Sequence, residues 1–421
     1  MTPTRPRVAI LGAGPAGVDA ALEAAERDWE LAVYEAAPRP GGNVRSWGHV
    51  RLFSPWSINA SPRMRRALAQ GPERLELPVD ETCPTGHELA ERVLDPVARL
   101  PQVAPRLRLG TRVLAVGREG LLKHEEIGSP ERGGRAFRLL VRDAEGRERF
   151  ETADAVVDCT GSLTHPNALG DGGVPALGEA AAEAAGLVER RLPDVAADPA
   201  PWAGRTTLLV GAGHSAQTAA RDLAALAREA PGTRVLWALR SGSPAEPPSW
   251  RVPDDPLPAR DRLAAEAEAL ARGEASGIEP RFGVAVERLE PADGRVRVTL
   301  RSRDGALETV EADRVLALTG AVGDHALYRQ LQVHECYASG APMKLSAALL
   351  AAGGGAADCM AQTGHGPETL LNPEPRFFIL GMKSYGRNTA YLMRIGWQQV
   401  DDAFGLLAES FEREGATAAA S

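Results

Sequence analysis

A glycine-rich turn between a short apolar strand and a helix, close to the start of the chain, constrains the fold most. Residues 8–11 (VAIL) form an apolar run typical of a buried parallel strand. The turn after it reads GxGxxG: the first glycine permits a tight turn, the second lets a pyrophosphate approach the backbone, and the third lets the helix pack on the strand. The helix, expected to reach about Arg27, would bind the pyrophosphate with its unpaired N–H groups. The predicted cofactor contacts are Gly12, Gly14, Pro15, Ala16 and Gly17.

An acidic residue ends the next predicted strand, residues 31–34. Glu35 stands 23 positions after Gly12, where a dinucleotide-binding fold places an acid on the adenosine ribose. Two adjacent glycines, the second of them Gly42, follow and would let the chain run close to a bulky ligand. Arg39, between the acid and the glycines, is placed to meet a phosphate. These residues extend the predicted cofactor site beyond the first turn.

A segment of the first half of the chain repeats in the second half. Residues 137–161 and 296–320 align without gaps, so Thr160-Gly161 falls on Thr319-Gly320. Each copy reads as two alternating strands with a polar turn, followed by an apolar strand that ends in Thr-Gly. We therefore expect two units of one design, with the Thr-Gly pairs at matching positions. The alignment also places Ala153-Asp154 on Ala312-Asp313.

A second dinucleotide signature precedes the second copy. Residues 207–210 read as a strand, and the turn after them is GxGxxA, an accepted variant of the glycine pattern. The strand predicted over residues 234–239 ends in Arg240. An acid at this position would favour NAD, whereas arginine can accept the 2′-phosphate of NADP. The predicted contacts of this second site are Gly211, Gly213, His214, Ser215, Ala216 and Arg240.

Composition narrows the class of protein further. A length of 421 residues favours two domains, and a net charge of -8 gives no reason to propose nucleic acid or an anionic membrane as a partner. No apolar run is long enough to span a membrane, and the chain enters its first strand without a signal peptide. The four cysteines (Cys83, Cys159, Cys336 and Cys359) form no CxxC pair, which predicts a reducing, cytoplasmic location. The histidines show no metal-ligand spacing, so we expect no metal.

The whole arrangement resembles the two-domain FAD/NAD(P)H flavoproteins, which include class B flavin monooxygenases and thioredoxin reductase-like enzymes. The implied fold class is α/β, with two Rossmann-like dinucleotide-binding domains of the three-layer ββα type. The implied FAD-binding domain is discontinuous, over residues 1–199 and 326–421, and the NAD(P)H-binding domain, over residues 200–325, is inserted in it. About 40 more residues separate the first glycine from the Thr-Gly pair in the first unit than in the second, as a ligand larger than a nicotinamide dinucleotide requires.

The same resemblance adds further residues to the expected sites. It implies FAD contacts beyond the first turn and Glu35, and it places the flavin ring and ribityl chain near the segment that precedes the last helix. The residues implied in this way are Gly42, Asn43, Trp47, Thr160, Gly161, Gly381 and Lys383. Thr319 and Gly320 are their counterparts in the NAD(P)H domain.

The resemblance leaves the type of reaction open between three readings. We favour an NADPH-using FAD monooxygenase that forms a C4a-hydroperoxide with molecular oxygen and oxygenates a small-molecule substrate, because that chemistry needs no cysteine pair. Asn59, in an Asn-Ala-Ser segment similar to the Asn-Thr-Ser of flavin-containing monooxygenases, with Tyr385 and Arg387, is the expected catalytic set. One alternative is a flavin reductase of a disulfide, quinone or other acceptor, and the other is a redox-sensing flavoprotein with slow turnover. The oligomeric state stays open, with a homodimer as one option.

Overall fold

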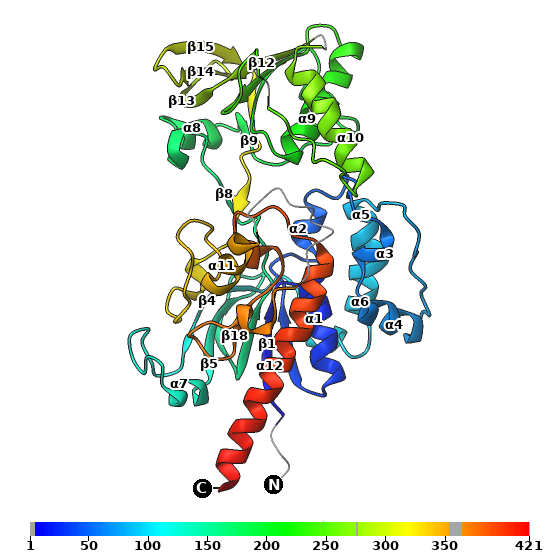
Figure 1. Cartoon of the computed structure of the whole chain (residues 1–421), viewed down its shortest axis with the longest axis vertical. Coiled ribbons are helices and arrows are strands. Elements are labelled where there is room, and N and C mark those ends of the chain that lie inside the picture. The colour runs from blue at the N-terminus through cyan, green and yellow to red at the C-terminus, as the bar shows by residue number, and fades with distance from the viewer. Residues whose placement is uncertain (1–4, 247, 275–276, 353–363, 421) are drawn as a thin grey trace. The chain divides into compact units, whose positions relative to one another are not determined.

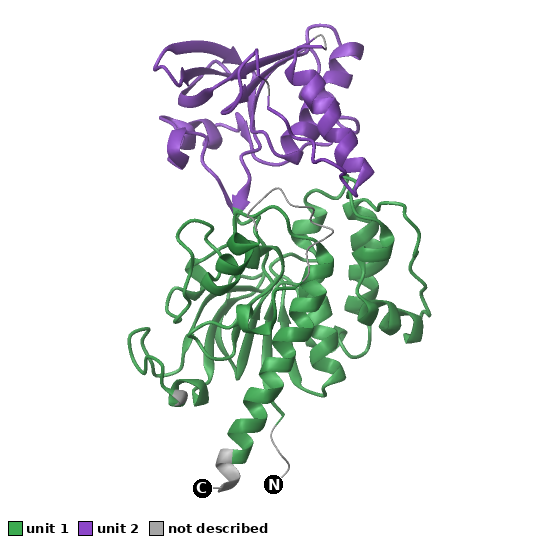
Figure 2. Ribbon diagram, viewed as in Figure 1, with its two compact units in different colours: residues 1–164, 322–421 green, residues 165–321 purple. Residues whose placement is uncertain are grey.

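The chain folds into two compact units, which we describe from a computed structural model (Figure 2). The structure describes residues 5–246, 248–274, 277–352 and 364–420. Unit 1 comprises residues 1–164 and 322–421, and unit 2 comprises residues 165–321. Residues 165–199, which the sequence analysis assigned to the FAD-binding domain, thus belong to unit 2. The reason is local pairing: within this segment Val188 pairs with Val315, and Leu177 exchanges backbone hydrogen bonds with a meander strand of unit 2.

Unit 1 has a five-stranded parallel sheet in the order β18-β7-β1-β2-β3. Figure 1 labels β1 and β18 of this sheet. Successive residues of its central strand point to opposite faces, as the pleat of a strand requires. Val8 and Ile10 lie in a core shared with the helices, whereas Ala9 and Leu11 lie in a core shared with an antiparallel meander. The unit is therefore three-layered, of the predicted ββα type. The elements are β1 (Arg7–Leu11), β2 (Glu30–Tyr34), β3 (Leu107–Arg108), β7 (Ala155–Asp158) and β18 (Phe377–Ile379); helices α1 (Pro15–Glu26) and α12 (Met393–Ala420); and meander strands β4 (Arg112–Arg118), β5 (Phe137–Arg142) and β6 (Glu148–Ala153).

Unit 2 repeats this plan with a sheet in the order β12-β11-β10-β16-β9. Leu209 of the central strand packs in the helix-side core and Leu208 in the meander-side core. The elements are β9 (Val188–Glu189), β10 (Thr206–Val210), β11 (Arg234–Leu239), β12 (Ile278–Phe282) and β16 (Arg314–Ala317); helices α8 (Glu179–Ala184), α9 (His214–Glu229) and α10 (Pro258–Ala271); and meander strands β13 (Val284–Ala292), β14 (Arg295–Ser302) and β15 (Leu307–Ala312).

The sequence repeat has the same strand register in both units. Phe137 pairs with Ala153 in unit 1, and the aligned Val296 pairs with Ala312 in unit 2. The aspartate after each alanine accepts a hydrogen bond from the central strand of its own parallel sheet: Arg7 N donates to Asp154 (2.8 Å) and Thr206 N donates to Asp313 (2.7 Å). The aspartate of the repeated Ala-Asp pair therefore joins the end of each meander to the start of the central strand of its parallel sheet.

A helical subdomain between β2 and β3 accounts for the extra length of unit 1. Its longest helix begins at a capping box on Thr85 and runs without interruption through a π-helical turn to Arg99. Its apolar face packs in the helix-side core of unit 1. The elements are α2 (Gly42–Arg45), α3 (Trp56–Asn59), α4 (Pro62–Gln70), α5 (Gly86–Leu89), η1 (Ala90–Leu94) and α6 (Asp95–Arg99).

The remaining elements are short. They are α7 (Pro130–Gly134), α11 (Met343–Ala351), the two-residue strands β8 (His165–Pro166) and β17 (Ala321–Val322), and the 3₁₀ helices η2 (Ala104–Arg106), η3 (Asp171–Gly173), η4 (Ala326–Tyr328), η5 (Pro367–Leu370) and η6 (Gly381–Tyr385). Over the described residues, every helix is too short or too polar to cross a lipid bilayer.

Candidate functional site

The first glycine turn has the geometry of a pyrophosphate cradle. Gly12 has a φ of +93°, and a Cβ on Gly17 would lie 1.9 Å from the Gly12 carbonyl oxygen, so neither position accepts a side chain. A Cβ on Gly14, by contrast, would meet no atom within 4 Å. Open space therefore lies over the residue that caps α1, where the unpaired N–H groups of a helix attract an anion. The turn fits a dinucleotide pyrophosphate.

Glu35 is buried beside this turn and is held by two backbone groups. Its carboxylate accepts hydrogen bonds from Ala13 N (2.8 Å) and Ala37 N (2.9 Å). Burial raises the pKa of Glu35, and the two backbone hydrogen bonds act against that rise. Each carboxylate oxygen keeps a further lone pair for a ribose hydroxyl. A Cβ on Gly42 would lie 2.5 Å from the Ala37 Cβ and 3.3 Å from a Glu35 carboxylate oxygen, and the clash with Ala37 explains the need for glycine there.

The loop after Glu35 carries the other predicted contacts. Asn43 donates to the Thr160 carbonyl (3.1 Å) and so joins this loop to the end of β7. The Trp47 ring packs against Gly86, where a Cβ would lie 2.7 Å from it. Arg39, expected to meet a phosphate, forms an ion pair with Asp95 at 2.6 Å and keeps about half of its side chain exposed. Its phosphate role stays a prediction.

A buried ion pair at the end of β7 was not foreseen from the sequence. The Lys383 ammonium lies 2.6 Å from the Asp158 carboxylate, and both side chains are inaccessible to solvent. Lys383 also donates to Thr160 Oγ1 (3.2 Å) and to the Asp324 carbonyl (2.7 Å), which uses all three of its N–H groups. Thr160 in turn donates its N–H and its hydroxyl to Asp158. Lys383 is therefore a buried residue whose hydrogen bonds join three segments of unit 1.

The segment before α12 comes close to the first turn of α1. Gly381 has a φ of +72°, and a Cβ there would lie 3.3 Å from the Ala16 Cβ. The Gly381 N–H donates to Gln399 of α12 (2.9 Å). This contact brings Gly381 to the first glycine turn, as the predicted FAD site requires.

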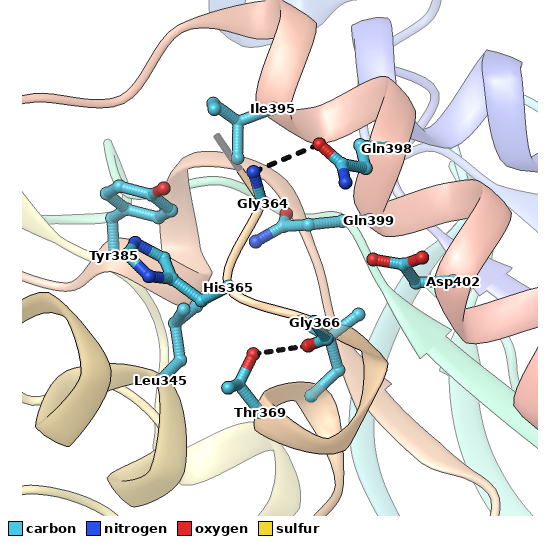
Figure 3. Close-up of a pocket in the computed structure, with 11 residues that line it drawn as sticks. Leu345, Gly364, His365, Gly366, Thr369, Tyr385, Ile395, Gln398, Gln399 and Asp402 are labelled. Atoms are coloured by element: carbon cyan, nitrogen blue, oxygen red, sulfur yellow. Dashed lines mark hydrogen bonds between the residues drawn. The ribbon is translucent and has the colours of Figure 1, made fainter. Parts of the chain in front are cut away.

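The three expected catalytic residues lie in different environments. Tyr385 is wholly buried, its hydroxyl has no hydrogen-bond partner among the described residues, and burial raises its pKa to about 12. It lines a cavity of about 10 Å³ beside His365 (Figure 3), which has room for one water but not for an organic substrate. Arg387 is exposed and donates its backbone N–H to Ser339. Asn59 is buried and exchanges two hydrogen bonds with Ser54 (2.7 and 2.8 Å), which braces its own loop.

The second glycine turn repeats the cradle in unit 2. Gly211 has a φ of +133°, and a Cβ there would lie 2.2 Å from the Leu318 carbonyl oxygen, whereas a Cβ on Gly213 would meet nothing within 4 Å. His214 begins α9, Ser215 is exposed beside it and Ala216 is buried against the sheet. The turn therefore fits a second pyrophosphate.

The carboxyl ends of the strands complete this second site. Arg240 follows β11 and is exposed, and its carbonyl accepts a hydrogen bond from Arg303 (3.1 Å). Asn167 donates to the Thr319 carbonyl (3.0 Å) and lies against Gly320, just as Asn43 does at Thr160 and Gly161. The sequence did not predict that an asparagine would make the same contact in both units, because Asn43 and Asn167 do not occupy aligned positions in the repeat.

The sequence and fold comparisons agree on the class of protein. Residues 6–340 match the family described as pyridine nucleotide-disulphide oxidoreductase. The chain belongs to that family, whose members bind FAD and NAD(P)H, and the two cradles fit those cofactors. The described residues contain no group of three or more metal-ligating side chains that could hold a metal ion.

Similar solved structures include both reductases and monooxygenases. The bacillithiol disulfide reductase of Bacillus cereus is 20% identical with a TM-score of 0.66, over 96% of this chain and 99% of that one. The FAD-bound cadaverine monooxygenase of Erwinia amylovora is 12% identical with a TM-score of 0.62, over 96% and 94%. The ornithine hydroxylase of Pseudomonas aeruginosa is 17% identical with a TM-score of 0.61, over 97% and 100%. At these identities the likeness concerns the fold alone.

A curated relative matches a short segment. A probable N-methylproline demethylase of Rhizobium meliloti (strain 1021) is 54% identical over 41 residues, which is 10% of this chain. The match spans 6% of the length of that relative.

Proposed function

We propose that the chain is an NADPH-using FAD monooxygenase that oxygenates a small-molecule substrate with molecular oxygen. The observation that carries the proposal is the state of Cys159, the cysteine beside the first glycine turn. Burial raises the pKa of its thiol well above the ordinary value, and the described cysteines (Cys83, Cys159 and Cys336) remain unpaired with one another. A dithiol at the flavin, which a disulfide reductase of this plan uses, is thus not available among them.

The two glycine turns assign one cofactor to each unit in this proposal. In unit 1, Gly14 and the first turn of α1 hold the FAD pyrophosphate, and Glu35 holds the ribose. In unit 2, Gly213 and the first turn of α9 hold the NADPH pyrophosphate, with Arg240 on the 2′-phosphate. Bound FAD would accept a hydride from NADPH and react, once reduced, with oxygen. The remaining residues position these groups and keep water out.

A second candidate function is reduction of a disulfide through one cysteine. Hydrogen bonds from the Ser339 N–H, the Ser339 hydroxyl and the Ala338 N–H lower the pKa of the Cys336 thiol, which would favour a thiolate. The likeness to a bacillithiol disulfide reductase also supports this candidate. Cys359 lies outside the described residues, so the test below includes it.

Oxygen stoichiometry separates the two candidates. We expect purified, FAD-loaded protein to form about one oxygenated product for each oxygen and each NADPH consumed, with little hydrogen peroxide, whereas a reductase reoxidised by oxygen would release hydrogen peroxide instead. Cadaverine and L-ornithine, which the similar enzymes use, are the first amines to test. The variants Cys159→Ser, Cys336→Ser and Cys359→Ser should each keep most of this activity. Loss of turnover in Cys336→Ser or Cys359→Ser, with FAD content unchanged, would instead establish the reductase. A chain that is slow with oxygen and with disulfides would point to a redox sensor.

Cofactor preference should depend on Arg240. Arg240→Ala should weaken NADPH binding about 5- to 150-fold, because an arginine–phosphate contact contributes about 1–3 kcal/mol. Binding of NADH, which lacks the 2′-phosphate, should hardly change. Arg234→Ala, at the opposite end of β11, is the matched control and should alter neither affinity. Titration of each variant with both nucleotides measures the effect, and equal weakening toward NADPH and NADH would remove Arg240 from the phosphate site.

A further inference from the structure

The turn between β14 and β15 reaches the strand end that is followed by Arg240. Arg303, the first residue of this turn, donates its N–H to the Gly283 carbonyl (3.1 Å), and its guanidinium donates to the Arg240 carbonyl (3.1 Å). Gly283 directly follows β12, and a Cβ there would lie 3.8 Å from the Arg303 Cδ. The Arg303 side chain therefore crosses from the end of β12 to the end of β11, its neighbour in the sheet of unit 2.

The guanidinium groups of Arg240 and Arg303 are both available to a ligand. Both residues are exposed, and among the described residues neither group forms an ion pair with a carboxylate. Asp304, the acid next to Arg303, accepts hydrogen bonds from the Ser302 hydroxyl and the Ala306 N–H within its own turn. Two positive charges therefore stand at one strand end, and a phosphate dianion is a ligand that would pair with both.

The sequence repeat provides a comparison of this place with its counterpart in unit 1. In the gapless alignment, Arg303 falls on Ala144. The register of the two meanders makes Gly110, shortly after β3, the equivalent of Gly283. Both glycines are left-handed, with φ of +61° and +64°, and a Cβ on Gly110 would lie 3.1 Å from the Ala144 Cβ. The two units thus have the same backbone here but a methyl group in one and a guanidinium in the other.

The difference between the units matches the difference between two ribose groups. Unit 1 has the Glu35 carboxylate after β2 and the small Ala144 nearby, which suits a ribose with free hydroxyls. Unit 2 has Arg240 after β11 and Arg303 beside it, which suits a ribose with a 2′-phosphate. We propose that Arg303, from the meander, is a second residue that selects NADPH, by binding the 2′-phosphate together with Arg240. The inference rests on the proposed use of NADPH and deepens it.

Two nucleotides that lack the nicotinamide test this role without any turnover. Adenosine 2′,5′-bisphosphate has the 2′-phosphate, and adenosine 5′-monophosphate does not. Calorimetric titration of the full-length, FAD-loaded chain should show tighter binding of the bisphosphate. Arg303→Ala should weaken its binding about 10-fold, because a charge-assisted contact is lost, and should leave binding of the monophosphate unchanged. Arg301→Ala is the matched control: Arg301 already pairs with Glu287 at 2.8 Å, so neither affinity should change.

Two further variants separate a phosphate contact from mere support of the Arg240 carbonyl. A glutamine side chain can donate the same hydrogen bond to that carbonyl but has no charge. Arg303→Gln should therefore lose as much affinity for the bisphosphate as Arg303→Ala, whereas Arg303→Lys should keep most of it.

The outcomes that contradict the inference differ from those that contradict the proposed function. Full affinity for the bisphosphate in Arg303→Gln would overturn the inference alone, as would an Arg303→Ala variant that weakens both nucleotides equally or neither. A wild-type protein that binds the two nucleotides equally would overturn the proposed use of NADPH, and the inference with it.

Discussion

Replacing Glu374 with alanine should lower the free energy of unfolding of unit 1 by about 3–5 kcal/mol, because it leaves buried charges without a partner. The Glu374 carboxylate lies 2.7 Å from Arg118 and 2.9 Å from Arg132, and at most 1% of any of the three side chains is exposed. It also accepts the Gln332 N–H at 2.7 Å. Burial lowers the pKa of Arg118, and its guanidinium would remain enclosed after the substitution.

Amide hydrogen exchange of peptides from β4 and β5 measures this effect, since a two-unit chain need not unfold in one step. Glu148→Ala is the matched control. Glu148 pairs with Arg142 at 2.6 Å, but each side chain is nearly half exposed, so its loss should cost less than about 1 kcal/mol. Similar effects of Glu374→Ala and Glu148→Ala would show that burial does not set the strength of the Glu374 cluster.

Replacing Lys383 with methionine should destabilise unit 1 by a similar amount, about 3–5 kcal/mol, and should also release FAD. The substitution leaves the Asp158 carboxylate buried with only Thr160 as a donor. It also removes the hydrogen bond from Lys383 to the Asp324 carbonyl and the link between η6 and the end of β7. Amide hydrogen exchange of peptides from β7 measures the loss of stability, and the protein-bound flavin absorbance measures the loss of FAD.

The double variant Lys383→Met, Asp158→Asn distinguishes the effect of an unpaired buried charge from the effect of losing the hydrogen bonds of Lys383. A neutral amide still accepts from Thr160, so most of the stability should return. FAD retention should recover less, because the link through Lys383 stays broken. A double variant as unstable as Lys383→Met would show that the lysine acts through packing and not through its charge pair.

The fold could be predicted from local patterns of the sequence. The GxGxxG turn, the strands on either side of it and the acid at residue 35 are set by short-range geometry, because only glycine fits where Gly12 and Gly17 stand. The gapless repeat predicted two units of one design. The two meanders have matching registers, since a shift by one residue would turn their apolar side chains away from the core.

The buried polar contacts could not be predicted in this way. Lys383 and Asp158 are 225 residues apart, and Arg118 and Glu374 are 256 apart. Nothing in the local sequence distinguishes Arg118 or Arg132 from the other arginines of an arginine-rich chain. Asn43 and Asn167 make equivalent contacts with the two Thr-Gly pairs only because of where the folded chain places them. The extent of unit 2 depended on the pairing of a two-residue strand, β9, which carries almost no periodic signal.

The way unit 2 closes on itself has a consequence for protein engineering. At its amino end, the Asn167 N–H donates to the carbonyl of Gly320 at its carboxyl end (2.9 Å), and Thr319 Oγ1 donates to the Asn167 carbonyl (2.7 Å). The two ends of residues 165–321 therefore lie side by side within the unit. Because its ends lie together, we expect this segment to tolerate production as a separate polypeptide, circular permutation, or exchange for the equivalent segment of a relative.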